Sequence, residues 1–144
     1  MYVDYIYLDN EERRRFAQEQ HEYLIRQTQF TGEVAIAANE KTVKTRLDFN
    51  HPVKELIFAV HDSANKPSDH SDGSGNPVKS AHLMLNGHAR FSARDGTYFD
   101  CVVPSQVHSH TPSRGVNVIS FALTPEKVQP SGSCNFSRID NAQL

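Results

Sequence analysis

The sequence predicts an all-β fold, an antiparallel β-sandwich or jelly roll with one short helix near residues 10–19. Two observations lead to this class. Short segments alternate apolar and polar residues with a period of two, which is typical of half-buried strands. Turn-forming Asn, Asp, Gly and Pro separate these segments, giving about eight strands at sandwich-like spacing. The sequence has no internal repeat and no alternation of strands with helices, either of which would indicate another fold class.

The first element expected is a strand over residues 2–8, where large aromatic side chains alternate with other residues. Asp9 then has the character of a helix N-cap, and Glu12 completes a capping box, so we predict a helix over 10–19. Three arginines at 13–15 lie among glutamates. This mixture favours a solvated helix face with intrahelical ion pairs over nucleic-acid binding.

The next segments are mostly strands. We interpret residues 21–29 as a strand rather than a helix extension, and residues 32–39 as a loop. Residues 41–49 alternate charged and apolar side chains, which predicts a half-exposed strand. After a turn, residues 53–60 form a strongly apolar strand that we expect at the centre of a sheet.

Residues 61–80 are rich in Asp, Ser, Asn, Gly and Pro, and we expect an exposed loop there. Strands are predicted at 81–85 and 89–93, joined by Asn86-Gly87, whose residues favour the positive φ of a tight hairpin turn. Asp95-Gly96 has the composition of a second such turn.

The last third of the chain is the part around which the rest is expected to pack. Residues 97–103 are interpreted as a strand that Pro104 ends, and 104–114 as a connection. Residues 115–123 carry apolar groups on both faces, so this strand should be covered on both sides. After a turn, a short strand-like run extends from 134 to 139.

Composition limits the function. The 144 residues carry a formal net charge of −2, which gives no basis for tight non-specific nucleic-acid binding. No apolar run approaches the roughly 20 residues that span a bilayer, and residues 1–10 lack the basic start of a signal peptide. Cys101 and Cys134 are therefore expected as reduced cytosolic thiols, and the Asn135-Phe136-Ser137 acceptor pattern as unmodified.

Several residues are candidates for chemistry. His108 and His110 have the spacing of a jelly-roll metal site, but the glutamate that a cupin pattern needs is replaced by Arg114 or Gly115. The acidic residues and histidines within 61–80 lack the spacing of a calcium loop. Cys101 lies in an apolar run, as a small core residue does. We assign no catalytic, cofactor-binding or metal-binding residue, no cofactor and no enzymatic activity.

Six blocks together carry a family resemblance. They are YIYLDNEERRRFAQ at 5–18, HEYLIRQTQ at 21–29, FNHPVKELIFAV at 49–60, LNGHARFSARDGTYF at 85–99, the strand end at 120–125 and PSGSCNFSRIDNAQL at 130–144. In this order they resemble the major capsid proteins of nucleocytoplasmic large DNA viruses, with algal-virus and iridovirus-like members the most similar.

The resemblance implies a structural protein of an icosahedral viral capsid. Such proteins associate with themselves into trimeric, pseudo-hexagonal capsomers. The implied partners are copies of the chain, neighbouring capsomers and minor capsid proteins, without direct nucleic-acid binding or membrane insertion. The implied location is the virion, after synthesis in the host cytoplasm. Residues 1–144 would form most of the second, C-terminal jelly roll of a double jelly-roll protein.

The resemblance also implies that this jelly roll is incomplete, because the family's opening and closing strands are missing from it, and such a sandwich exposes sheet edges. We therefore expect Tyr5, Tyr7 and Phe121 to lack partners and the chain alone to be marginal and aggregation-prone. In the family-like run from Asn135 to Asp140, we expect Arg138 to pair with a carboxylate such as that of Asp140, and Phe136 and Ile139 to anchor the end of the sandwich.

Two other functions are compatible with a jelly roll. A carbohydrate-binding module would use exposed aromatic residues in its outer loops, and residues 61–80 and 104–114 contain no Phe, Tyr or Trp. A cupin-like metalloprotein would need a glutamate at a fixed spacing after His108 and His110, and that position is occupied by Arg114 or Gly115.

Overall fold

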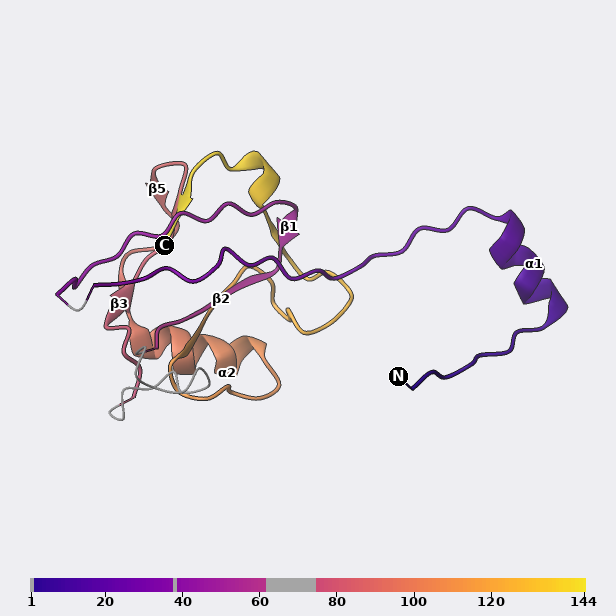
Figure 1. The fold of residues 1–144 in the computed structure, drawn as a ribbon, viewed down its shortest axis with the longest axis horizontal. Coiled ribbons are helices and arrows are strands. Elements are labelled where there is room, and N and C mark those ends of the chain that lie inside the picture. Colours follow the sequence, from indigo (N-terminus) through magenta and orange to yellow (C-terminus); the bar gives the residue numbers. More distant parts are fainter. Residues whose placement is uncertain (1, 38, 62–74) are drawn as a thin grey trace.

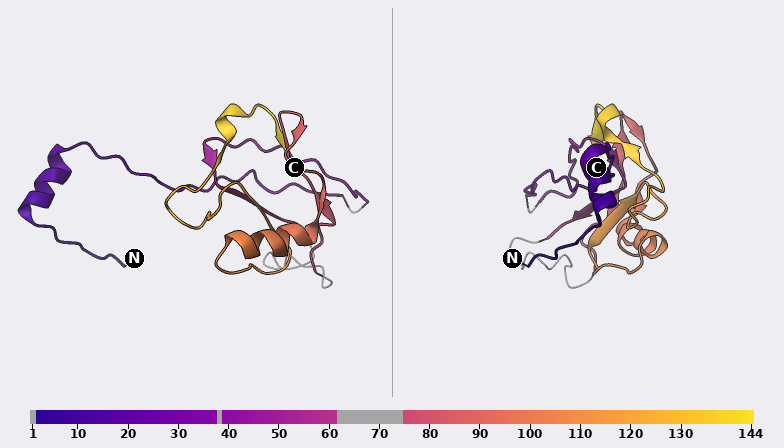
Figure 2. Two further views of the ribbon diagram at one scale, coloured as in Figure 1. Left: turned by 180° about the vertical axis from the view of Figure 1, so that it is seen from behind. Right: turned by 90° about the vertical axis from the view of Figure 1, so that its right-hand side faces the viewer.

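The computed structural model describes residues 2–37, 39–61 and 75–144. Figure 1 shows a body of short strands and helical turns and an N-terminal arm that carries helix α1 away from it. The reverse view in Figure 2 shows the same separation. The described strands are short and antiparallel.

Helix α1 spans Asn10–Gln18 and begins where the sequence predicts. The Glu12 backbone N–H donates to the Asp9 Oδ1 atom at 2.8 Å, which is the expected N-cap bond. No residue of α1 is buried, so its local sequence rather than packing holds it. The strand predicted at 2–8 is wrong: the segment is exposed and pairs with no strand in the described part of the chain. A strand needs a neighbour for its N–H and C=O groups.

The longest strand pair joins β2 (Glu55–Ala59) to β7 (Val116–Ser120), with Ile57 opposite Val118. Strand β7 is covered on both faces, as predicted: Asn117 is 0% exposed and Val118, on the other face, is 1% exposed. The central position predicted for residues 53–60 is wrong, because β2 pairs only with β7 among the described residues.

A three-stranded sheet contains β5 (His88–Ala89), β4 (Met84–Leu85) and β9 (Ala142–Gln143) in that order. The predicted Asn86-Gly87 turn is confirmed: φ is 50° at Asn86 and 80° at Gly87, as this hairpin turn requires.

The strand predicted at 41–49 is reduced to a bridge between Arg46 and Gln143. Backbone bonds flank this bridge, including one of 2.8 Å from the Thr45 N–H to the Leu144 carbonyl oxygen. The C-terminal residues therefore lie between β4 and the 45–47 segment.

Two short pairs complete the sheets. Strand β1 (Pro52–Val53) pairs with β8 (Cys134–Asn135), and β3 (Ser80–Ala81) pairs with β6 (Arg94–Asp95). The hairpin turn predicted at Asp95-Gly96 is wrong, because Asp95 belongs to β6, which pairs with a strand preceding the Asn86-Gly87 hairpin.

The strand predicted at 97–103 is also wrong. Residues Tyr98–Val102 form a π-helical turn, η1, that continues into α2 (Val103–Val107). Phe99 and Val103 are four residues apart and both buried, which matches a helical face better than a strand. Pro104 does not end this element. It stands at the start of α2, where the π-helical turn passes into the α-helix.

Among the described residues, one apolar core connects the sheets and the helical turn. Its buried members are Leu47, Leu56, Leu83, Phe99, Ile119, Phe136 and Ala142. Phe136 opens the short 3-10 helix η2 (Phe136–Arg138) and meets the rings of Phe49 and Phe121 edge-on, at centroid distances of 6.1 and 5.9 Å.

Phe136 therefore anchors this end of the sandwich as predicted, and partly buried Ile139 packs against the same core. The expectation that Phe121 lacks a partner is wrong, since its ring contacts Phe136. Among the described residues, no ion pair joins Arg138 to Asp140.

Candidate self-association surface

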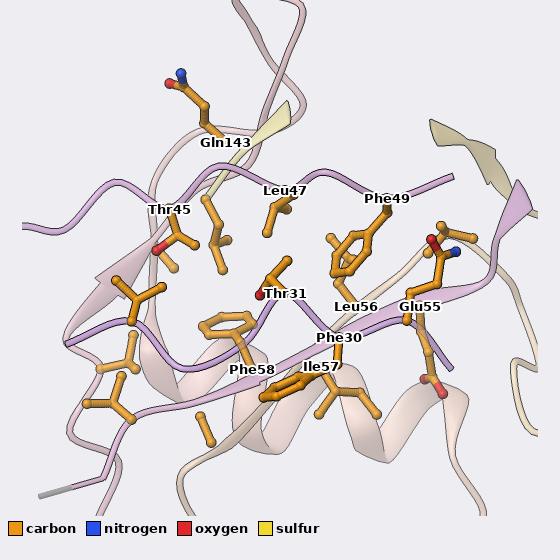
Figure 3. A pocket seen from close by; sticks show the side chains of 18 of the residues that line it. Phe30, Thr31, Thr45, Leu47, Phe49, Glu55, Leu56, Ile57, Phe58 and Gln143 are labelled. Carbon is orange, nitrogen blue, oxygen red and sulfur yellow. The ribbon is translucent and has the colours of Figure 1, made fainter. Parts of the chain in front are cut away.

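An open groove that is mostly apolar lies between the 24–37 segment, residues 51–61 and residues 77–82. Figure 3 shows Phe30 and Ile57 among its lining side chains, together with Leu47 and Phe58 of the body. Phe30 is 79% exposed and Ile57 is 60% exposed, so the described chain covers neither. An apolar surface of this kind marks an interaction site in soluble proteins.

The groove borders an open sheet edge. Strand β2 uses one edge to pair with β7, and no described strand pairs with the other. An unpaired edge presents N–H and C=O groups that can pair with another strand. The combination of a free edge and exposed apolar side chains is what strand-to-strand association requires.

The strand predicted over 21–29 is wrong, since no described residue of this range pairs in a sheet. Side chains attach the 24–37 segment to the body instead. Gln29 donates to the Asn50 carbonyl oxygen at 2.6 Å and accepts from the Asn50 N–H at 2.8 Å. Arg26 donates to the Glu126 carbonyl oxygen at 2.9 Å. These few bonds fix one wall of the groove.

A cluster of ionisable side chains lies at one end of the groove. The His108 Nε2 atom is 2.7 Å from the Glu55 Oε2 atom, and Nδ1 is 3.8 Å from the Glu126 Oε1 atom. Glu126 also accepts from the Ser109 N–H at 2.9 Å and from its hydroxyl at 3.2 Å. Hydrogen bonds from the Ser109 backbone N–H and hydroxyl lower the pKa of Glu126, burial opposes them, and the charges of His108 and His110 lower it further by smaller amounts.

The sequence does not reveal this cluster, because Glu55, His108 and Glu126 are far apart in the chain and each is an ordinary surface residue type. His108 and His110 do not act as a pair here: His108 faces two carboxylates, while His110 bonds the Ser109 hydroxyl at 3.2 Å. Among the described residues, no group of three or more His, Cys, Asp or Glu side chains could hold a metal ion.

Cys101 lies beside an ion pair between buried Asp100 and half-exposed Arg114. Arg114 Nε is 3.1 Å from the Asp100 Oδ2 atom, and the Arg114 Nη1 group donates to the Cys101 sulfur at 2.9 Å. Burial, followed by the hydrogen bond and the charge of Asp100, raises the pKa of the Cys101 thiol against the opposing charge of Arg114. A thiol held protonated is a poor nucleophile.

The N-terminal arm is the second exposed apolar region. Tyr5 is 79% exposed and Tyr7 is 92% exposed, which agrees with the expectation that both lack partners. The arginines at 13–15 are exposed, and Arg15 lies 3.8 Å from Glu19 in an intrahelical ion pair.

Most of the 61–80 segment, with the acidic residues and the histidine considered above as calcium ligands (Asp62, Asp69, His70 and Asp72), lies outside the described residues. No described helix has the length and apolar character to cross a membrane.

Comparison with known proteins identifies the family. The family model "Large eukaryotic DNA virus major capsid protein" matches residues 12–144, most of the chain. The chain belongs to this family. The resemblance found in the sequence is thereby confirmed. A major capsid protein of Pyramimonas orientalis virus is 46% identical over 167 residues, an alignment that covers 100% of this chain and 40% of that protein.

Solved structures support the same relationship. A quasi-atomic model of the PBCV-1 virus capsid matches with a TM-score of 0.78, 38% identity and coverage of 96% of this chain and 41% of that one. The crystal structure of PBCV-1 VP54, fitted into a reconstruction of the virophage Sputnik, matches with a TM-score of 0.82 and the same identity and coverage. The all-β jelly-roll class is confirmed by this likeness, although the chain spans about two fifths of the length of these relatives.

Proposed function

We propose that this chain is part of a structural protein of an icosahedral viral capsid. In this proposal it works by self-association in the virion and catalyses no reaction. The observation that carries the proposal is the likeness of nearly the whole chain, 96% of its residues, to a capsid subunit that has been placed in a virus particle.

The residues form most of the C-terminal jelly roll of a double jelly-roll subunit in this proposal. Support comes from the share of length: the chain covers 41% of the PBCV-1 capsid chain, which is about the share of one of two similar domains. The exposed arm, including Tyr5 and Tyr7, is then covered by other parts of the assembled protein.

Three such subunits would associate into a pseudo-hexagonal capsomer, which would contact neighbouring capsomers and minor capsid proteins after synthesis in the host cytoplasm. The groove and the free edge of β2 offer the apolar surface and the unpaired backbone groups that such contacts use. The groove is therefore the surface that we assign to association.

The first test measures the mass and location of the native protein, with an antibody against residues 61–80. A species well above the 16.2 kDa of this chain, within particles, is the expected result and would place the residues in a larger subunit. A 16.2 kDa species found only outside particles would overturn the structural role.

The second test addresses the groove. Ile57→Glu places a charge in the groove, whereas Leu123→Glu makes the same change at another exposed position, where the side chain is 77% exposed. Chemical cross-linking of the subunits should give trimers for the parent protein and for Leu123→Glu, and fewer for Ile57→Glu. Equal trimer yields from both variants would exclude the groove from the contact.

A further inference from the structure

His108 stands at a junction of three elements. It is the C-cap of α2, its Nε2 atom lies 2.7 Å from a carboxylate at the start of β2, and its Nδ1 atom lies 3.8 Å from a carboxylate in the turn after β7. Its side chain is only 14% exposed, against 23% for Glu55 and 43% for Glu126. The imidazole is therefore the best shielded of the three groups from solvent.

The protonation state of the imidazole decides how many of these contacts are favourable. A neutral imidazole has one N–H, so it can donate to one carboxylate while its other nitrogen turns a lone pair toward the second. An imidazolium has two N–H groups and a positive charge between two negative ones. The C-terminal end of a helix also favours a cation. The charged form therefore holds Glu55 and Glu126 together, and the neutral form holds only one of them.

We propose that His108 is an acid-strengthened clamp, whose imidazolium fastens the turn at Glu126 to the start of β2 at Glu55 and whose neutral form releases the turn. The other ionisable groups around the clamp are His110 on the same loop, and Arg26 and Lys54, which donate to backbone carbonyl groups of residues 126–128. Arginine and lysine side chains ordinarily keep their charge at the pH values where histidine changes its own.

The turn is held most firmly in a defined pH window. Histidine is the residue type whose charge ordinarily changes between about pH 5 and 8, so a contribution that needs the imidazolium form is present at acid pH and absent at alkaline pH. The pKa of Glu126 is lowered from 4.5, so its carboxylate contribution is present above that value and is lost as the pH falls through the lowered pKa. Because Pro125 and Glu126 line the groove, the clamp sets how firmly one rim of the groove is held. This inference does not depend on the proposed function.

Hydrogen exchange followed by mass spectrometry on the full chain tests the clamp. Peptides covering residues 122–131 are compared with peptides from β7 at about pH 5.5 and about pH 8. After correction for intrinsic exchange, protection of 122–131 relative to β7 should fall about fivefold at the higher pH, the effect of one cation at a partly buried helix end.

His108→Gln keeps a donor but cannot take up a proton, so its turn should show the same weak protection at both pH values. His88→Gln, at an exposed position on β5, is the matched control and should behave as the parent chain does. The proposal is overturned if His108→Gln keeps the pH dependence of the parent, or if the parent shows none.

A second variant decides the outcome if His108→Gln loses protection throughout the chain. Glu126→Gln keeps an oxygen that can accept the Ser109 bonds but removes the second carboxylate. It should abolish the pH dependence in 122–131 while β7 stays protected. A pH dependence that persists in Glu126→Gln would contradict the clamp.

Discussion

The Asn76 side-chain amide donates a hydrogen bond of 2.6 Å to the Asn117 Oδ1 atom, and both side chains are buried. The same Asn76 amide donates to the Gly96 carbonyl oxygen at 3.1 Å, and Asn117 donates to the Gly115 carbonyl oxygen at 3.0 Å. Two buried amides thus join β7 to the residues around Asn76 and Gly96. Buried amides contribute stability only while their partners are kept.

Replacing Asn117 with leucine should destabilise the chain by about 1–3 kcal/mol, because Asn76 would lose a buried acceptor. Urea denaturation followed by fluorescence measures the free energy of unfolding. Asn141→Leu is the control, since Asn141 is exposed. Equal shifts for the two variants would show that the buried amide pair contributes little.

Position 96 has room only for a residue without a side chain, which is glycine. A Cβ atom at this position would overlap the Val78 carbonyl oxygen, a backbone atom that cannot move freely. We expect Gly96→Ala to cost about 3 kcal/mol, at the upper end for overpacking, and to displace the β3–β6 pair beside it.

Gly87→Ala provides the comparison. Gly87 has φ of 80°, but nothing lies within 4 Å of the position that a Cβ atom would take, so alanine there would cost only the conformational strain, about 1 kcal/mol. Thermal unfolding of both variants separates the two causes. A larger loss for Gly87→Ala than for Gly96→Ala would mean that the close approach at Val78 is relieved without cost.

Local signals in the sequence predicted the local structure well. Asp9 caps α1 and Asn86-Gly87 forms its turn because each depends on neighbouring residues alone. The error at 97–103 has a different origin. Alternating apolar residues there also satisfy a helical spacing through Phe99 and Val103, and only packing against β7 decides between the two.

The candidate surface could not be predicted from the sequence. The apolar residues at 53–60 indicate burial, but they cannot say whether the cover comes from the same segment of chain or from outside it. Ile57 is 60% exposed because the described residues leave its side of β2 open. Likewise, Glu55 and His108 meet only because β2 and α2 both pack on β7.

Arg114 supplies the counter-charge for a carboxylate that is completely buried. Its Nε atom lies 3.1 Å from Asp100 Oδ2, and Asp100 Oδ1 has no partner among the described residues. Arg114→Met would leave the carboxylate unpaired. The expected cost is about 2 kcal/mol, below that of a fully buried pair, because Arg114 is half exposed and solvent screens its charge.

A double variant tests this assignment. Asp100→Asn removes the charge that Arg114 compensates, so the Asp100→Asn/Arg114→Met protein should recover part of the stability lost in Arg114→Met. Urea denaturation of the two single variants and the double variant gives the coupling energy. Strictly additive losses would contradict a charge interaction between the two side chains.

The N-terminal arm should make the isolated chain prone to associate. Tyr2, Tyr5, Ile6 and Tyr7 are each at least 79% exposed, and nothing in the described part of the chain covers them. Large apolar side chains on an unpaired extended segment favour aggregation. Tyr5→Ser/Tyr7→Ser should therefore reduce the large species seen in sedimentation velocity. The free energy of unfolding should not change, because these rings pack against no core residue.

The control is the Glu11→Ser/Glu22→Ser variant, whose two positions are also exposed, and it should leave association undiminished. A parent chain that sediments as a single monomer and unfolds cooperatively would contradict the prediction.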